Sequence, residues 1–383
     1  MELIGRNYQD GENIRVVIKN GVIDCVYPHT TEKNLPYIAP GLVDLQLNGY
    51  QGVDLNGPAL VPEDVRRMVH TLWEQGVTSF FPTVITNATE MISGSLRVIA
   101  AACDRFPEVA AAVLGIHLEG PFISKEDGPR GAHKTVFVKA PDWDLLMSWQ
   151  QDSGNRIKLI TLSPEWPDSN AFIEKCVRAG IKVAIGHTAA SREQIKKGTA
   201  AGMTLSTHLG NGCHQVLPRY PNYIWNQLAT DQLWSSLIAD GIHLPEDVLR
   251  VFLKVKPDTS FLVSDATHLA GMPPGCYRTH IGSEVVLEEA GRLYMKDSPG
   301  HLAGSAKSLV WCVSHLVRTG ILSLAQAWDL ASLKPLAFLD DRQICPFEAG
   351  RPADLVLFQQ TANGIQVAET IKSGKPVFTL NNI

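Results

Sequence analysis

The chain lacks the features that mark secreted, membrane-spanning or nucleic-acid-binding proteins. None of its apolar runs approaches the ~18 uninterrupted residues of a membrane span, and its first residues lack the basic-then-apolar order of a signal peptide. Lysine and arginine number 34 against 39 acidic residues, for a formal charge of −5, and no basic run could follow a nucleic-acid backbone. We therefore expect a cytoplasmic protein with no membrane or nucleic-acid partner.

Cysteine is sparse and scattered. The seven cysteines are odd in number and include no C-x-x-C pair, which argues against a disulfide framework and against a zinc ribbon. Their pattern is that of reduced thiols in a reducing compartment. Cys213 lies shortly after His208, where it could be a metal ligand or a small residue that lines a pocket.

The two ends of the chain carry similar β patterns. Residues 14–18 and 22–26 flank Asn20-Gly21, which is typical of a hairpin turn. Residues 353–358 and 367–371 have the same strand-like character. We expect a small β-sandwich domain built from residues 1–40 and 345–383.

Between these ends, apolar runs alternate with amphipathic segments, which indicates parallel strands joined by helices. The length of 383 residues suits a (β/α)8 barrel of about 250 residues with an added domain. We predict an α/β fold with a TIM-type barrel over residues 41–344 and a glycine-punctuated insertion or long loop at 276–300. The expected strands are 42–47, 77–83, 110–119, 157–162, 181–187, 203–208, 235–240 and 260–265, and the expected helices are 62–75, 89–105, 142–151, 168–179, 191–201, 245–255 and 305–319.

Polar side chains stand where these strands end. Glu119 follows an apolar run before a Gly-Pro turn, and His187 and His208 end two later runs. The carboxyl ends of barrel strands converge on one face, so these three side chains form a ligand set for a divalent metal with one position left open for water.

Other strands end in the same way, at Asp44 to Asn48, at Asp240 to His243 and at Asp265. A single such residue is more simply a polar group that caps its strand, but convergence at six of eight strands favours catalysis. A divalent ion lowers the pKa of bound water from about 15.7 towards about 7. Asp265 could then act as general base and pass the proton to a leaving amine, although it could also be the N-cap of the next segment. This chemistry hydrolyses an amide.

Successive motifs resemble those of the N-acetylglucosamine-6-phosphate deacetylases of the amidohydrolase superfamily. They begin with Ala-Pro-Gly-Leu-Val-Asp at 39–44 and His-Leu-Glu-Gly-Pro-Phe at 117–122, and continue at 186–188, 207–209, 239–243, 263–266 and 302–305. The resemblance implies hydrolysis of N-acetylglucosamine 6-phosphate to glucosamine 6-phosphate and acetate. It also implies that Glu119, His187 and His208 hold the metal and that Asp265 is the acid and base.

The resemblance further implies a substrate site and a dimer. His133 would bind substrate and polarise the acetyl carbonyl, since a donor beside the metal stabilises the oxyanion. Arg219 would reach the phosphate in the neighbouring subunit of a homodimer, whereas the residue alone would indicate only a solvated loop cation. The implied substrate contacts are Ala132, His133, Asn211, Gly212, Arg219, His243 and Leu302.

The sequence departs from the family in two places. Gln46 and Asn48 stand where two-metal relatives have His-x-His, so we expect one metal ion, with Zn2+ as the first choice and Fe2+, Co2+ or Mn2+ as alternatives. Residues 210–215 replace a large residue followed by Asn-Ala-Met, and this loop borders the sugar phosphate. The galactosamine epimer, another acyl group or an unphosphorylated sugar therefore stays open as the substrate.

The sequence leaves two other functions to consider. A cyclic-amide or cyclic-imide hydrolase commonly bridges two metals with a modified lysine, and the run 156–162 ends without one. A non-catalytic sugar-phosphate sensor needs no general base, so Asp265 beside a complete ligand set argues against it.

Overall fold

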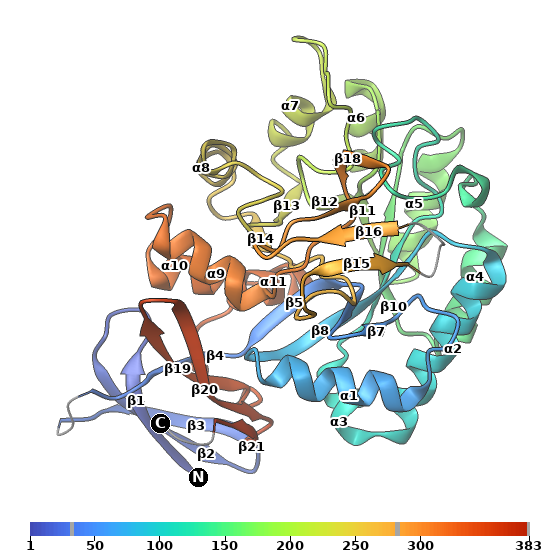
Figure 1. Cartoon of the computed structure of the whole chain (residues 1–383). Helices are drawn as coiled ribbons and strands as arrows, with labels where there is room; N and C mark the ends of the chain where they lie inside the picture. The colour runs from blue at the N-terminus through green and yellow to red at the C-terminus, as the bar shows by residue number, and fades with distance from the viewer. Residues whose placement is uncertain (31–33, 280–283, 381–383) are drawn as a thin grey trace.

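An eight-stranded parallel sheet forms the body of the molecule (Figure 1). The computed structural model describes residues 1–30, 34–279 and 284–380. The strands in order are β5 (Leu42–Leu47), β8 (Val77–Ile85), β9 (Ile116–Glu119), β10 (Ile157–Leu162), β11 (Lys182–Ile185), β12 (Met203–Ser206), β13 (Trp234–Leu237) and β14 (Ser260–Leu262). Leu47 bridges Ala266, and the Asp265 amide donates to the Gln46 carbonyl at 3.0 Å, so the last strand returns to the first. The predicted barrel is confirmed.

Helices cover the outside of the barrel because their apolar faces pack on the sheet. The Ser191 and Gln194 side chains each accept a hydrogen bond from the other's backbone amide, which forms a capping box at the start of α6. The described helices are α1 (Pro62–Trp73), α2 (Thr89–Arg105), α3 (Pro107–Ala112), α4 (Trp143–Asp152), α5 (Ser169–Arg178), α6 (Arg192–Ala200), α7 (Tyr223–Leu228), α8 (Glu246–Val255), α9 (Leu309–Arg318), α10 (Leu324–Leu330) and α11 (Leu333–Asp340). None of them is long and apolar enough to cross a membrane.

The barrel interior is a packed core. Alternate strand residues point inward, as the period of two along a strand requires. Phe338 of α11 lies against Phe261, with ring centroids 5.4 Å apart. The buried cluster comprises Val43, Leu45, Phe81, Leu159, Ala184, Leu205, Ile238, Phe261, Val263 and Phe338. With the interior filled, a ligand can be accommodated only at an end of the barrel.

Both chain ends build one small sheet, drawn in blue and red in Figure 1. Its strand order is β21 (Lys375–Thr379), β20 (Gly364–Lys372), β19 (Leu355–Thr361), β4 (Tyr37–Pro40), β1 (Glu2–Asn7), β2 (Asn13–Lys19) and β3 (Val22–Pro28). β2 and β3 form the predicted hairpin, in which Asn20 and Gly21 have φ of 52° and 81°. Trp328 of α10 stacks on Phe358 with centroids 4.2 Å apart, which ties this sheet to the barrel.

Two segments differ from the expected elements. Residues 107–112 form α3, because Pro107 occupies the first helical turn and three alanines follow, so β9 begins only at Ile116. The insertion is an antiparallel sheet of β15 (Gly275–Arg278), β16 (Glu284–Leu287), β17 (Leu293–Met295) and β18 (Ser298–Leu302). Residues 280–283 of the predicted insertion lie outside the described residues.

Candidate active site

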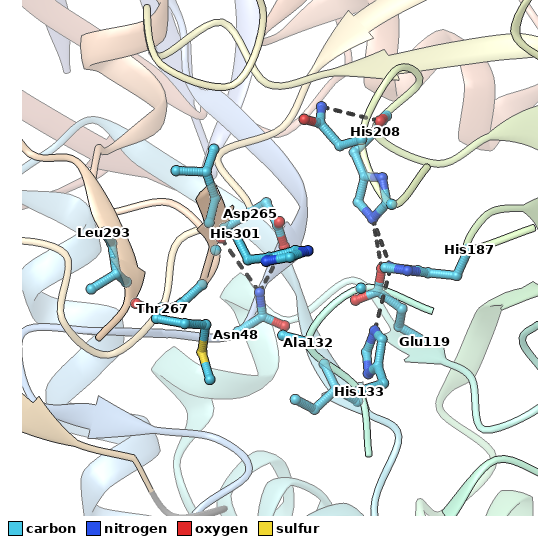
Figure 2. A pocket seen from close by; sticks show the side chains of 18 of the residues that line it. Asn48, Glu119, Ala132, His133, His187, His208, Asp265, Thr267, Leu293 and His301 are labelled. Atoms are coloured by element: carbon cyan, nitrogen blue, oxygen red, sulfur yellow. Dashed lines mark hydrogen bonds and ion pairs between the residues drawn. The ribbon is translucent and has the colours of Figure 1, made fainter. Parts of the chain in front are cut away.

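A cavity of about 470 Å3 lies at the carboxyl ends of the barrel strands (Figure 2). The strand ends form one wall, and the rest of the lining consists of the loop after β12, which packs against His187, and the four-stranded insertion sheet. With the exception of Arg219, every site residue expected from the sequence lines this cavity: Glu119, Ala132, His133, His187, His208, Asn211, Gly212, His243, Asp265 and Leu302.

Three ligand atoms meet on the strand-end wall. Glu119 Oε1 lies 3.2 Å from His187 Nε2 and 3.0 Å from His208 Nε2, and the two ring nitrogens are 3.1 Å apart. Burial raises the pKa of Glu119, but hydrogen bonds from the two histidines outweigh burial and hold it well below the usual range. An ionised carboxylate therefore faces two imidazoles.

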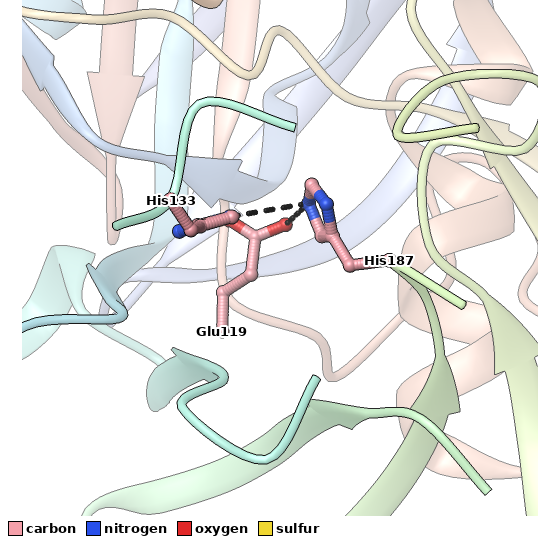
Figure 3. Close-up of side chains that lie close together, drawn as sticks. All are labelled: Glu119, His133 and His187. Atoms are coloured by element: carbon pink, nitrogen blue, oxygen red, sulfur yellow. Dashed lines mark hydrogen bonds and ion pairs between the residues drawn. The ribbon is translucent and has the colours of Figure 1, made fainter. Parts of the chain in front are cut away.

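His133 also reaches this cluster. Its Nε2 lies 3.3 Å from His187 Nε2, and ligand atoms of Glu119, His133 and His187 all lie within 4.8 Å of one another (Figure 3). Arg130 holds the loop in place by donating to the His133 carbonyl at 2.6 Å. Burial, reinforced by His187, lowers the pKa of His133 to about 3, so the ring is neutral. The family resemblance implied a substrate-binding role for His133, and the geometry adds the capacity to act as a metal ligand.

The donor set fits a divalent cation. The Nδ1 of His187 lies 2.9 Å from the Pro129 carbonyl, an acceptor that keeps a proton on Nδ1, so Nε2 is the nitrogen that can bind a cation in place of its hydrogen bond to Glu119. One carboxylate with two or three imidazole nitrogens is a common set for zinc and related ions.

The amides Gln46 and Asn48 orient the two acids of the site. Gln46 Nε2 donates to Glu119 Oε1 at 2.9 Å, and Asn48 Nδ2 donates to Asp265 Oδ1 at 2.8 Å. Each amide NH2 group thus donates to a carboxylate, and the neutral amide oxygens are weaker metal ligands than the imidazoles found at these positions in two-metal relatives. This arrangement favours a single ion.

Asp265 is poised to exchange protons near neutral pH. Burial, reinforced by the charge of Glu119, raises the pKa of Asp265 to about 6, against opposing effects of His208 and His243. A general base works best when its pKa lies near the working pH.

Backbone strain marks three of these positions. His187, His208 and Asp265 have φ of 49°, 30° and 48° just beyond their strands. Non-glycine residues adopt this region only where the surrounding structure holds them, and such residues cluster at functional sites. The turn at each strand end directs the side chain into the cavity.

His243 lies on the same cavity, oriented by its neighbour Asp240. Its Nδ1 lies 2.7 Å from Asp240 Oδ2, and Asp240 Oδ1 accepts from the amides of Ile242 and His243. Burial raises the pKa of Asp240, but the hydrogen bond with His243 outweighs it, so the carboxyl stays ionised. The other ring nitrogen of His243 is left for a ligand.

The loop after β12 packs directly on the cluster. At Gly212, which has φ of 56°, an added Cβ would lie 2.7 Å from His187 Nδ1, so glycine allows this close approach. The Cys213 thiol donates to the Gly210 carbonyl at 3.2 Å, and burial raises its pKa. A protonated thiol bonded in this way suits a pocket-lining role better than metal binding.

Arg219 lies outside the cavity of its own chain. It is exposed, and within the described part of the chain its guanidinium forms no hydrogen bond or ion pair. Val216 and Tyr220 on the same loop are 86% and 79% exposed. The loop projects beyond the barrel at the top of Figure 1, where it could reach another molecule.

Sequence reasoning missed several cavity residues. Val285, Leu293 and Met295 of the insertion sheet form an apolar part of the lining. His268 and Asp54 also line the cavity, with His268 Nδ1 3.5 Å from Asp54 Oδ2. Lys134 also lines the cavity. The β-like runs within 276–300 were the one available signal for this part of the lining, because loop residues follow no strand-end pattern.

Comparisons with known proteins identify the family of this chain. The model of the Amidohydrolase family matches residues 37–377. An N-acetylglucosamine-6-phosphate deacetylase of Danio rerio is 31% identical over 363 residues (91% of this chain, 86% of that protein), and one of Haemophilus influenzae is 28% identical over 386 residues (97% of each).

Solved structures of deacetylases of the same name share the fold. The enzyme of Thermotoga maritima has a TM-score of 0.84 with 28% identity and covers 99% of this chain and 100% of its own. The Mycobacterium smegmatis enzyme, in complex with N-acetyl-D-glucosamine-6-phosphate, has a TM-score of 0.85 with 24% identity and covers 99% of both chains. The chain described here belongs to the amidohydrolase family, among the N-acetylglucosamine-6-phosphate deacetylases.

Proposed function

We propose that this protein hydrolyses the N-acetyl group of N-acetylglucosamine 6-phosphate to give glucosamine 6-phosphate and acetate. The observation that carries the proposal is the meeting of Glu119, His187 and His208 in one cavity with Asp265. Relatives with the deacetylase name match along 91% and 97% of the chain. A protein that only senses a sugar phosphate would have no use for a carboxyl poised near neutral pH.

Glu119, His187 and His208 would hold one divalent ion, with Zn2+ as the first choice and Fe2+, Co2+ or Mn2+ as alternatives. When bound, such an ion supplies a Lewis acid that polarises the acyl carbonyl and makes a water nucleophile available at neutral pH. Gln46 and Asn48 keep both acids oriented by donating to them at 2.9 Å and 2.8 Å.

Asp265 carries the proton of the reaction. Its carboxylate takes a proton from water as the water oxygen bonds to the acyl carbon, and it delivers that proton to the amide nitrogen as the carbon–nitrogen bond breaks. Acetate and the free amine result. Burial keeps the His133 ring neutral, so it carries one N–H group. That group can donate to the acyl oxygen, where negative charge develops.

The sugar phosphate would contact residues around the cavity rim, and Arg219 would complete the site from a partner subunit. Its exposure and its position outside its own cavity support this role. We therefore propose a homodimer, located in the cytoplasm in keeping with seven free cysteines. The proposed contacts of the same chain are Ala132, His133, Asn211, Gly212, His243 and Leu302.

Acetate release tests the proposal. Metal-stripped and reconstituted protein is given N-acetylglucosamine 6-phosphate, the galactosamine epimer and each unphosphorylated sugar. We expect metal-dependent acetate release from N-acetylglucosamine 6-phosphate. Turnover of the epimer alone would reassign the substrate, and absence of turnover with the ion bound would defeat the proposal.

A further inference from the structure

The cavity contains one lysine and no arginine among the residues that the structure describes. That lysine is Lys134, and the implied phosphate contact Arg219 lies outside the cavity of its own chain. A phosphate monoester carries a charge of about −1.5 to −2 at neutral pH. Apart from histidines, Lys134 is thus the cation that this chain itself offers to such a group.

The backbone that carries Lys134 is well anchored. Arg130 donates to the His133 carbonyl at 2.6 Å and to Asp127 Oδ1 at 2.8 Å, and His133 Nε2 lies 3.3 Å from His187 Nε2. The Lys134 backbone is extended, and its carbonyl accepts from the Phe137 amide at 3.1 Å. The backbone of Lys134 is therefore held in place directly beside His133, which contacts the proposed metal ligand His187.

The Lys134 side chain, in contrast, is available to bind a ligand. The residue is exposed, and within residues 1–30, 34–279 and 284–380 its ammonium forms no hydrogen bond or ion pair. The nearby Lys139, by comparison, donates to Thr89 Oγ1 at 3.0 Å. A flexible ammonium on a fixed backbone can follow a charged group that enters the cavity, as a point charge with three donors.

We propose that Lys134 binds the phosphate of the substrate together with His243 and sets the preference for phosphorylated over neutral amino sugars. His243 offers the ring nitrogen that Asp240 leaves open. This inference rests on the proposed deacetylation, and it makes part of the phosphate site independent of the partner subunit.

The test is the variant Lys134→Met, which keeps the length of the side chain and removes its charge. We expect KM for N-acetylglucosamine 6-phosphate to rise about tenfold with little change in kcat, since a charge-assisted contact to a non-reacting group is lost. KM for unphosphorylated N-acetylglucosamine should not change, and competitive inhibition by inorganic phosphate should weaken in parallel. Lys134→Arg should restore most of the affinity.

Lys125→Met is the matched control. Lys125 lies on the same loop, with its ammonium 5.3 Å from the Trp166 ring centroid, and it does not line the cavity. An active Lys134→Met enzyme with unchanged KM and unchanged phosphate inhibition would overturn the role of Lys134 and leave the deacetylation intact. If the wild type released no acetate, calorimetry with inorganic phosphate on wild type and Lys134→Met would still decide the matter, and equal affinities would overturn it.

Discussion

The strand ends and the loop after β12 differ in how deeply their side chains are buried and in how firmly the fold holds their backbone. The strand-end wall carries Glu119, His187 and His208, each of which is less than a tenth exposed, whereas the loop after β12 lines the cavity only as far as Gln215 and beyond it exposes Val216 and Tyr220 almost fully. On the first wall, the sheet fixes each backbone and the positive φ of both histidines directs their side chains inward. On the second, the exposed segment beyond Gln215 lies outside both the sheet and the cavity. This difference predicts that the first wall determines the chemistry and the second determines which substrate enters.

Loss of the carboxylate ligand should have the largest effect. Glu119→Gln keeps the size of the side chain but removes the charge that faces His187 and His208. We expect the protein to lose its ion and kcat to fall at least about a thousandfold, since the ion contributes several kcal/mol to the transition state. Elemental analysis and acetate release measure both effects.

The control for this variant is Glu193→Gln, an exposed glutamate on α6 whose Oε1 lies 3.8 Å from Lys197 Nζ. It should retain ion and turnover. A Glu119→Gln protein with a full complement of ion and normal kcat would show that the strand-end residues do not hold the ion that supports turnover.

Removal of the proposed base comes next. Asp265→Asn should keep the bound ion, because Asp265 is outside the ligand set, but kcat should fall at least about a hundredfold through loss of proton transfer. Asp258→Asn, at an exposed aspartate bonded to Lys334, is the comparison. An active Asp265→Asn enzyme would mean that another group takes the proton.

The pH dependence of kcat/KM tests the role of Asp265 at the strand ends without a mutation. Asp265 acts as a base only when ionised, and its pKa is raised to about 6. Activity should therefore be full above that pKa and fall about tenfold per pH unit below it. The positive charge of a bound ion moves the midpoint lower. A profile that stays flat down to pH 4 would contradict this assignment.

The smallest effect is expected in the exposed part of the loop after β12. Arg219→Ala should raise KM for the phosphorylated substrate roughly fivefold, about 1 kcal/mol for an exposed charged contact, and leave kcat unchanged. Arg192→Ala, at an exposed arginine on α6, is the control. An unchanged KM in Arg219→Ala would separate this loop from phosphate binding.

The same contrast explains how far the sequence could predict the structure. All eight barrel strands were predicted, because apolar runs that end in a polar residue or a turn leave little choice of element. The prediction of a strand at residues 110–115 was wrong, because the three alanines at 110–112 suit a helix as well as a buried strand. The strand pairing of the insertion sheet and the position of Lys134 in the cavity depend on tertiary packing, for which no local periodicity exists, and the position of Arg219 was implied only by the family resemblance.

Titration of metal-stripped protein with Zn2+ or Fe2+, while acetate release from N-acetylglucosamine 6-phosphate is followed, tests the central claim most directly. If one ion held by Glu119, His187 and His208 supports the reaction, activity should rise from the background and saturate at about one equivalent per chain. Full activity in the stripped protein, or saturation only at two equivalents, would contradict the single-ion site.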